Sequence, residues 1–159
     1  MSDKLPASVM RVQQAITDMG YDIRVNFLEV AARTAAEAAD AVGCKVEQIV
    51  KSLVLKAGES KKPVLVLVGG ANRLDEKLIG GYVGEPVKMA RADFVRKNSG
   101  YAIGGVPPVA HEVAMVTYID EDLMGFEEIW AAGGHPNALF QLKPDDLVKM
   151  TGGRVVPVK

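Results

Sequence analysis

The stretch Pro63–Val68, near the middle of the chain, is apolar at every position. The side chains of a strand alternate between two faces, so a strand is apolar throughout only when other elements cover both faces. We therefore expect Pro63–Val68 to be a central strand of a sheet. The run is too short to cross a bilayer, because a membrane-spanning helix needs about 20 apolar residues.

Further strands and helices are expected on both sides of this central strand. Apolar runs bounded by turn-forming residues predict strands over residues 23–28, 51–55, 86–90, 114–119, 128–132, 138–142 and 155–156. Helical spacing and capping residues predict helices over residues 6–19, 34–42, 73–79, 93–97 and 144–150. Because strands and helices do not alternate regularly, we expect an α+β fold with a curved, mixed or mostly antiparallel, barrel-like sheet flanked by helices. Residues 1–159 are expected to form a single domain.

Two helix starts are predicted from capping residues. Thr34 and Glu37 are spaced as a capping box, in which each side chain binds a free backbone N–H group of the first helical turn. Asn72 is expected to cap the helix over residues 73–79, and the pair Gly80–Gly81 is expected to end it.

The formal net charge of the chain is −1, but the charge is distributed unevenly. Residues 45–97 contain 11 Lys or Arg and 6 Asp or Glu, a balance of +5, whereas the remaining residues contain 8 and 14, a balance of −6. The middle of the chain could therefore face phosphate groups, or its charges could be an ordinary solvated mixture. Aromatic residues are sparse, so a nucleic-acid platform that stacks bases on many rings is not expected.

Cysteine usage and the N-terminal residues bear on the compartment. Cys44 is the only cysteine, so no intrachain disulfide can form, which is typical of a reducing compartment. Residues Met1–Pro6 contain no apolar core of a secretory signal. We therefore expect a cytoplasmic protein that does not bind membranes.

The stretch Ser99–Pro108 contains three glycines and two prolines, which packing alone does not explain well. Glycines bring bare backbone N–H groups to a surface, and such a loop can hold a small polar ligand with main-chain donors. A plain structural turn is the alternative. A second glycine turn, Gly133-Gly134 followed by His135, is also typical of ligand-binding loops, although His135 could equally be structural or simply exposed.

Lys51 interrupts the otherwise apolar run from Ile49 to Leu55. A lysine in such a strand either extends its ammonium to solvent or faces a functional cavity. Ser52 is adjacent in the strand, so its side chain should point to the opposite face, which argues against a Ser52–Lys51 catalytic dyad.

Several kinds of catalytic site lack their sequence signatures. The chain has two histidines and one cysteine, with no His-Glu-x-x-His or Cys-x-x-Cys pattern, so no metal site is expected. Gly69-Gly70 precedes a predicted helix but lacks the Gly-Lys-Ser/Thr ending of a phosphate-binding P-loop. No Gly-x-Ser-x-Gly nucleophile elbow is present.

Four stretches, in this order along the chain, resemble the YbaK-like family, whose members are related to the editing (insertion) domain of prolyl-tRNA synthetase. The resemblance covers the chain from about Thr34 to Val155, and the stretches are Thr34–Gly43, Gln48–Val54, Ser99–Pro108 and Ala132–Gly134, the last followed by Asp145–Leu147.

The resemblance implies a free-standing deacylase that hydrolyses mischarged tRNA, commonly tRNA(Pro) carrying a wrong small amino acid, without a metal or other cofactor. Lys51 would contact the phosphate or ribose of the tRNA 3′ end. The backbone N–H groups of Gly104 and Gly105 would hold the aminoacyl carbonyl, and Gly133 and Gly134 would line the pocket. The remaining residues expected to contact the substrate are Ser99, Gly100, Tyr101, Val106 and His135.

The family differs among its members at the position of His135, so the role of this residue, the amino acid removed and the cognate tRNA stay open. Prolyl-tRNA synthetase is a possible partner, and the oligomeric state is not predicted. A non-catalytic module that binds an aminoacyl or nucleotide group is the main alternative. A protein-interaction domain is a third hypothesis, but it leaves Lys51 and the paired glycine turns without a role.

Overall fold

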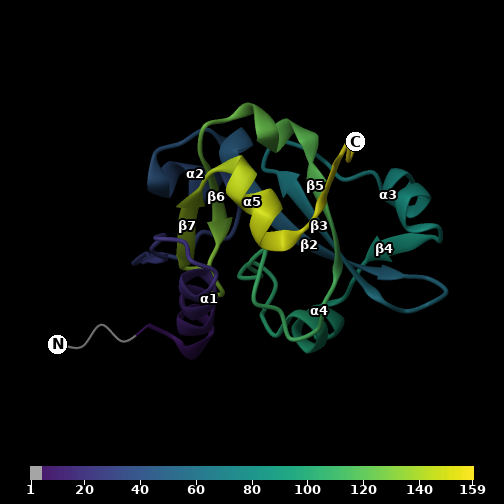
Figure 1. Cartoon of the computed structure of the whole chain (residues 1–159), viewed down its shortest axis with the longest axis horizontal. Helices are drawn as coiled ribbons and strands as arrows, with labels where there is room; N and C mark the ends of the chain where they lie inside the picture. Colours follow the sequence, from purple (N-terminus) through teal and green to yellow (C-terminus); the bar gives the residue numbers. More distant parts are fainter. Residues whose placement is uncertain (1–4) are drawn as a thin grey trace.

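Eight strands form one mixed sheet in the computed structural model, which describes residues 5–159 (Figure 1). The strands are β1 Asn26–Phe27, β2 Ile49–Ala57, β3 Pro63–Gly69, β4 Val87–Met89, β5 Val116–Asp120, β6 Ile129–Ala132, β7 Ala138–Leu142 and β8 Arg154–Val156. The α-helices around the sheet are α1 Ala7–Asp18, α2 Ala35–Val42, α3 Glu76–Val83, α4 Ala92–Ser99 and α5 Pro144–Thr151, with two 3₁₀ helices at Val46–Gln48 and Glu121–Gly125. The predicted α+β class, with helices flanking a mixed sheet, is confirmed.

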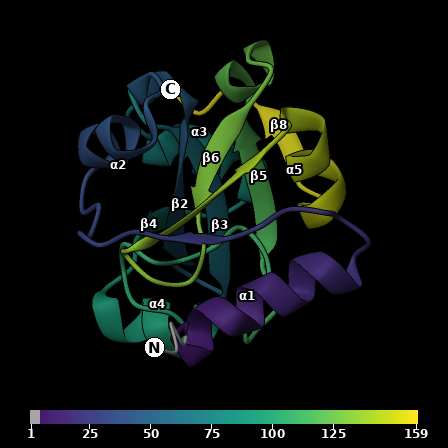
Figure 2. The same ribbon diagram turned by 90° about the vertical axis from the view of Figure 1, so that its left-hand side faces the viewer.

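Strand β3 is the central strand that its composition predicts. It pairs with β2 in the antiparallel sense and with β5 in the parallel sense. Leu65 and Leu67 pack into a core with α1 and α4 on one face, while Val64, Val66 and Val68 pack with α3 on the other face. Figure 2 shows α1 lying across the lower end of the sheet.

Strand β2 has an opening along one edge, and this opening positions the site. Its other edge is paired with β3 from Val50 to Lys56. On the open side, β6 pairs with β2 only at Ile49 and Val50, and β4 pairs only from Leu55 to Ala57. Next to the β4 pairing, the Ala90 N–H donates one further hydrogen bond to this edge, to the Val54 carbonyl at 3.1 Å. The sheet is therefore split beside residues 51–53.

The start of α2 is formed as its sequence predicts. The Thr34 hydroxyl accepts a hydrogen bond from the Glu37 N–H at 3.1 Å, and the Glu37 carboxylate accepts one from the Thr34 N–H at 3.2 Å. Gly43 ends the helix with φ +75°, a conformation that glycine adopts without strain. This capping box fixes where the chain enters the helix.

The predicted bounds of the helix after β3 were wrong at both ends. Asp75, not Asn72, caps α3 by accepting hydrogen bonds from the N–H groups of the next turn. Gly80 and Gly81 lie inside the helix, and Gly84, with φ +91°, ends it. The helix therefore ends at the glycine with the left-handed backbone that a C-terminal cap requires.

The predicted strand over residues 23–28 is reduced to β1, which covers two residues. The side chain of Gln13, on α1, takes the place of a neighbouring strand. Its amide nitrogen donates to the Ile23 carbonyl and its amide oxygen accepts from the Val25 N–H, both at 2.8 Å. The backbone of this segment is thus satisfied by a side chain rather than by a strand ladder.

Within residues 5–159, no helix has the length and apolar character needed to cross a membrane. The residues Met1–Lys4, part of the segment in which the sequence has no signal-peptide core, lie outside the described residues.

Candidate functional site

A cavity of 280 Å³ lies at the opening in β2. Small-molecule sites in proteins start at about this volume. Its walls come from β2, the start of α2, the end of β4, the glycine loop after α4, and Ala132 and Leu139 of β6 and β7. Elements far apart in the sequence therefore meet at the place where the sheet is split.

The lining of this cavity is apolar apart from a few hydroxyl and cationic groups. Thr34 and Ser52 supply hydroxyls, and Arg33 and Lys51 supply positive charge. Among the lining residues of the described chain there is no Asp, Glu, His or Cys. The N-terminus of α2 adds the positive end of a helix dipole. The cavity thus suits an anionic group or an oxygen that gains negative charge.

Lys51 is half-buried in β2, and its ammonium donates a hydrogen bond of 2.7 Å to the Asn72 carbonyl. Burial lowers the pKa of Lys51 below its ordinary value; the Asp120 carboxylate opposes this shift and the Arg73 guanidinium adds to it. The sequence left open whether Lys51 reaches solvent or a cavity. The structure places it in the wall of the cavity that Gly104 also lines.

Asp120 holds the turn that Lys51 binds, and the sequence did not single it out. Its carboxylate is 1% exposed and accepts hydrogen bonds from the Gly69 N–H at 2.9 Å and the Asn72 side-chain amide at 2.7 Å. The Asp122 N–H supplies a third, at 2.9 Å. In the sequence, Asp120 is the first of three consecutive acidic residues after the predicted strand over residues 114–119, so its burial was not marked by any local signal.

Ser52 is a second residue that the sequence did not assign to the site. Its hydroxyl oxygen is buried and has no hydrogen-bond partner within residues 5–159. The Val54 carbonyl points to the open side of β2, where it accepts from Ala90. Because backbone groups two residues apart in a strand point the same way, the Ser52 N–H and carbonyl also face the opening. Ser52 therefore lines this cavity with backbone groups that face the opening, and its hydroxyl is buried without a partner among the described residues.

The glycine loop contributes Ile103, Gly104 and Val106 to the cavity wall. The prediction that the Gly104 and Gly105 amides act together needs correction, because the Gly105 N–H already donates to the Ala102 carbonyl at 3.0 Å. The Gly104 N–H donates no hydrogen bond within residues 5–159. Gly104 is therefore the amide of this pair that stays available for a bound molecule.

The second glycine turn lies behind the loop and outside the cavity lining. A Cβ on Gly105 would lie 2.8 Å from the backbone N and Cα of His135, so the two turns are in direct contact. Gly133 donates to the Ala138 carbonyl at 2.8 Å, and Gly134, with φ +102°, packs against α1. The His135 ring contacts Phe27, with ring centroids 5.2 Å apart. This turn supports the loop from behind.

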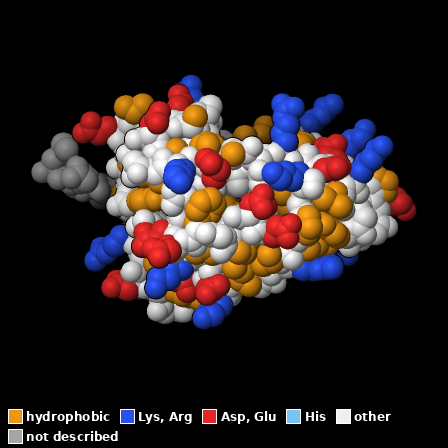
Figure 3. Space-filling model, turned by 90° about the horizontal axis from the view of Figure 1, so that it is seen from above, with side chains coloured by type: hydrophobic (Ala, Val, Ile, Leu, Met, Phe, Trp, Pro, Cys, Tyr) orange, Lys and Arg blue, Asp and Glu red, His pale blue; other side chains and the backbone are white. Residues whose placement is uncertain are grey.

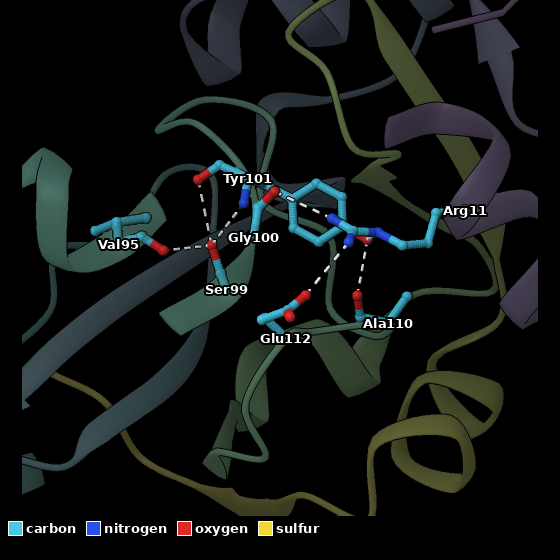
Figure 4. A network of polar contacts seen from close by, with 7 residues as sticks. All are labelled: Arg11, Val95, Ser99, Gly100, Tyr101, Ala110 and Glu112. Atoms are coloured by element: carbon cyan, nitrogen blue, oxygen red, sulfur yellow. Dashed lines mark hydrogen bonds and ion pairs between the residues drawn. The ribbon is translucent and has the colours of Figure 1, made fainter. Parts of the chain in front are cut away.

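Ser99, Gly100 and Tyr101 also lie outside the lining, in a buried network at the end of α4 (Figure 4). The Ser99 hydroxyl is 0% exposed; it donates to the Val95 carbonyl at 2.6 Å and accepts from the Tyr101 N–H at 3.1 Å. The Tyr101 hydroxyl donates to the Ala110 carbonyl at 2.7 Å. These contacts anchor both ends of the glycine loop.

Arg11 joins helix α1 to this network (Figure 4). Its guanidinium donates to the Tyr101 hydroxyl at 3.0 Å and to the Gly100 carbonyl at 3.1 Å, and lies 3.5 Å from the Glu112 carboxylate. It also lies 4.5 Å from the centre of the Tyr101 ring. One side chain of α1 therefore contacts the start of the glycine loop, at Gly100 and Tyr101, and the segment after the loop, at Glu112.

Replacing Arg11 by Ala is expected to lower the free energy of unfolding by about 1 kcal/mol, since the lost contacts are partly exposed. The free energy of unfolding of Arg11→Lys should lie between those of the wild type and Arg11→Ala, because an ammonium cannot reproduce the planar set of donors of a guanidinium. Urea unfolding measures the difference. Gln14→Ala, at an exposed position on the same helix, is the control. Equal losses in Arg11→Ala and Gln14→Ala would contradict the anchoring role.

Comparison with known proteins places this chain in a family. The model of the aminoacyl-tRNA editing domain family matches residues 29–150. A crystal structure described as a candidate trans-editing enzyme for prolyl tRNA synthetase has a TM-score of 0.93 and 46% sequence identity, covering 98% of this chain and 99% of that chain. The resemblance seen in the sequence stretches is thus matched by the whole fold.

Two further relatives are similar in sequence. YwhH of Bacillus subtilis (strain 168) is 27% identical over 150 residues, which cover 93% of this chain and 94% of that protein. A proline–tRNA ligase of Limosilactobacillus fermentum is 34% identical over 98 residues, which cover 59% of this chain but 17% of the ligase. Since the family model spans most of the chain and the fold agrees, the chain belongs to the aminoacyl-tRNA editing domain family.

Proposed function

We propose that the protein is a trans-acting deacylase that hydrolyses the ester of a mischarged tRNA, with tRNA(Pro) carrying a wrong small amino acid as the substrate. The observation that carries the proposal is the cavity at the β2 opening, where Lys51, Ser52 and Gly104, whose N–H has no partner within residues 5–159, line one apolar, electropositive space. The likeness to a candidate trans-editing enzyme for prolyl tRNA synthetase supports the choice of tRNA.

The proposed reaction uses a water molecule as the nucleophile. Its oxygen bonds to the aminoacyl carbonyl carbon, the ester bond to the terminal ribose oxygen breaks, and that oxygen takes up a proton. The products are the free amino acid and the uncharged tRNA. An aminoacyl ester is already activated, so holding the water and the ester in the correct geometry supplies a large part of the acceleration. A neighbouring ribose hydroxyl can position the water.

Each lining group has a role in this scheme. The Gly104 N–H donates to the carbonyl oxygen as it gains negative charge, a contact worth about 2.7–4 kcal/mol in other enzymes. The Lys51 ammonium contacts the phosphate or ribose of the terminal nucleotide. Ser52 donates to or accepts from the ester end of the substrate. Ser99, Gly100, Tyr101 and the turn Gly133–His135 keep the glycine loop in place without touching the substrate.

The size of the cavity favours a small amino acid. A volume of 280 Å³ with walls of Ala, Val, Ile and Leu leaves little room beyond the ribose and a short side chain. An apolar pocket distinguishes side chains that differ by one methylene by only about 1–3 kcal/mol. We therefore expect graded activity on several small amino acids rather than a single accepted one.

A deacylation assay over a panel of mischarged tRNAs tests the proposal. We expect hydrolysis of at least one tRNA(Pro) carrying a small non-cognate amino acid, with prolyl-tRNA(Pro) cleaved much more slowly. Binding of these tRNAs without turnover would instead favour a non-catalytic module. Neither binding nor turnover would reject both.

The lowered pKa of Lys51 predicts a pH dependence of kcat/KM, which reports groups of the free enzyme. Activity should fall on the alkaline side with a midpoint below the ordinary lysine value of 10.5, because the ammonium loses its charge early. Lys51→Arg should move this fall to higher pH. The folded-state pKa is depressed, so the unfolded chain binds more protons between the two values and the free energy of unfolding rises with pH there.

Rates corrected for uncatalysed ester hydrolysis measure this profile. An alkaline fall that stays at the same pH in Lys51→Arg would show that another group is responsible.

A further inference from the structure

A second hollow adjoins the editing cavity through a shared wall. It is an open groove of 770 Å³ between β2, the turn before α3, and α3 itself. Lys51, Leu53 and Met89 line both this groove and the cavity at the β2 opening. The two hollows therefore lie on either side of the same split in the sheet, and the proposed function leaves the groove without a role.

The groove is rich in positive charge. Arg73, Lys77 and Lys159 line it together with Lys51, against the two carboxylates of Asp75 and Glu76. Within residues 5–159, neither Arg73 nor Lys77 has a carboxylate at ion-pair distance. Lys159 pairs with Asp122 at 3.6 Å, and both side chains of this pair remain more than half exposed. Arg73 and Lys77 thus line the groove without a carboxylate partner among the described residues.

Both acids of the groove are already bound to backbone groups. Asp75 caps α3 through the N–H groups of Lys77 and Leu78, at 3.0 and 3.2 Å. Glu76 accepts a hydrogen bond of 2.8 Å from the Met89 N–H and so ties α3 to β4. These carboxylates are bound to backbone groups, whereas Arg73 and Lys77 have no carboxylate at ion-pair distance within residues 5–159. Four cations against two acids leave the groove with a positive balance.

The wider surface around the groove has the same sign. Residues 45–97 carry a balance of +5 in a chain with a net charge of −1. Figure 3 shows Lys and Arg side chains gathered over the end of the molecule that holds the β2–β3 hairpin, α3 and β4.

We propose that the groove lined by Arg73 and Lys77 binds the phosphates that precede the aminoacylated nucleotide, so that the RNA 3′ strand leaves the cavity past Lys51 towards α3. This inference rests on the proposed function for the identity of the RNA. Its chemistry is that of a flexible polyanion whose end lies in the cavity. Such a strand follows a continuous positively charged groove, and Arg and Lys contacts to phosphates set its affinity.

The test compares two probes, of which only one carries the nucleotides and phosphates that precede the terminal adenosine. One is an acceptor-stem minihelix whose terminal adenosine carries alanine through a stable amide; the other is the same alanyl-adenosine without any preceding nucleotide. The variant Arg73→Gln/Lys77→Gln is compared with Lys62→Gln/Lys97→Gln, which removes the same charge from exposed positions outside the groove. Urea unfolding checks that both variants fold as the wild type does.

Plotting the logarithm of the binding constant of the minihelix against the logarithm of the salt concentration gives a slope. Loss of two phosphate contacts should lower the magnitude of this slope by about 1.4, since each contact on a single strand contributes about 0.7. At about 0.15 M salt this makes minihelix binding about tenfold weaker, with alanyl-adenosine binding unchanged. The control variant should keep the wild-type salt dependence. Unchanged minihelix binding in the groove variant, or an equal loss in the control, would overturn the assignment.

The outcome is separable from that of the proposed function. If the wild type binds the minihelix through the groove but hydrolyses no aminoacyl-tRNA, the groove assignment stands and the deacylase proposal falls. If it hydrolyses aminoacyl-tRNA while the groove variant keeps full affinity and salt dependence, the deacylase proposal stands and the groove assignment falls.

Discussion

Replacing Lys51 by Ala is expected to lower kcat/KM for a mischarged tRNA by about 100-fold. The substitution removes a half-buried ammonium from the cavity wall while the backbone of β2 stays paired with β3. A hydrogen bond from a charged donor is worth about 1.5–3 kcal/mol, which corresponds to roughly 10- to 150-fold in rate or affinity. The measurement is release of the amino acid from mischarged tRNA at substrate concentrations below KM.

Lys56→Ala is the matched control for this experiment. Lys56 lies on the same strand but is exposed, outside the cavity, and close to the Phe94 ring on α4. We expect its loss to change kcat/KM by less than about threefold, because exposed charges contribute little. Wild-type activity in Lys51→Ala, or equal losses in both variants, would exclude a specific role for Lys51.

Gly105→Ala is expected to damage the protein more than Gly104→Ala does. The added Cβ would lie 2.8 Å from the backbone N and Cα of His135, and backbone atoms cannot move aside as a flexible side chain can. The two glycine turns must separate, which costs about 1–3 kcal/mol of stability as in other overpacked sites. The Gly104 amide would then lose its place in the cavity wall, so deacylation should fall by at least about tenfold as well.

At Gly104 the space is open, since the nearest atom to an added Cβ is the Pro136 side chain at 3.8 Å. Its backbone has φ +92°, so alanine there is strained by about 1–2 kcal/mol without a clash. Urea unfolding and deacylation, measured on both variants, separate the two effects. A Gly105→Ala protein with the stability and activity of Gly104→Ala would contradict the contact between the turns.

Ser99→Ala gives a third comparison, because it changes a residue at the start of the glycine loop without altering the backbone of Gly104. The structure adds a cost in stability, since the substitution leaves the buried Tyr101 N–H without its acceptor. An unpaired buried donor costs about 1–3 kcal/mol. We therefore expect Ser99→Ala to lower the free energy of unfolding while kcat/KM of the folded protein changes little.

The sequence predicted those parts of the fold that depend on local pattern. The all-apolar composition of β3 required covered faces, and the spacing of Thr34 and Glu37 specified a capping box; both are present. Predictions were wrong where a distant side chain replaced a local signal. Gln13 of α1 satisfies the backbone that was expected to form a longer strand, and Asn72 is held by Asp120 instead of capping α3.

The candidate site was partly predictable for the same reason. Lys51 and the glycine loop were recognisable because a cation in an apolar strand and glycines in a loop are unusual locally. The opening in β2 could not be predicted, since it arises from how far β4 and β6 extend along that strand. A sequence in which this opening is not visible gives Ser52 the pattern of an ordinary strand residue. The hydrogen bond that occupies the Gly105 amide is likewise a product of the folded loop.

The central claim is that the aminoacyl end of the RNA binds at the β2 opening, and amide NMR of the 17.0 kDa protein tests it most directly. Alanyl-adenosine with a stable amide in place of the ester is titrated into ¹⁵N-labelled protein. We expect the largest shift changes at the amides of Ser52 and Gly104. Largest changes around the 490 Å³ hollow beside Cys44 and Trp130, with those two amides unmoved, would contradict the claim.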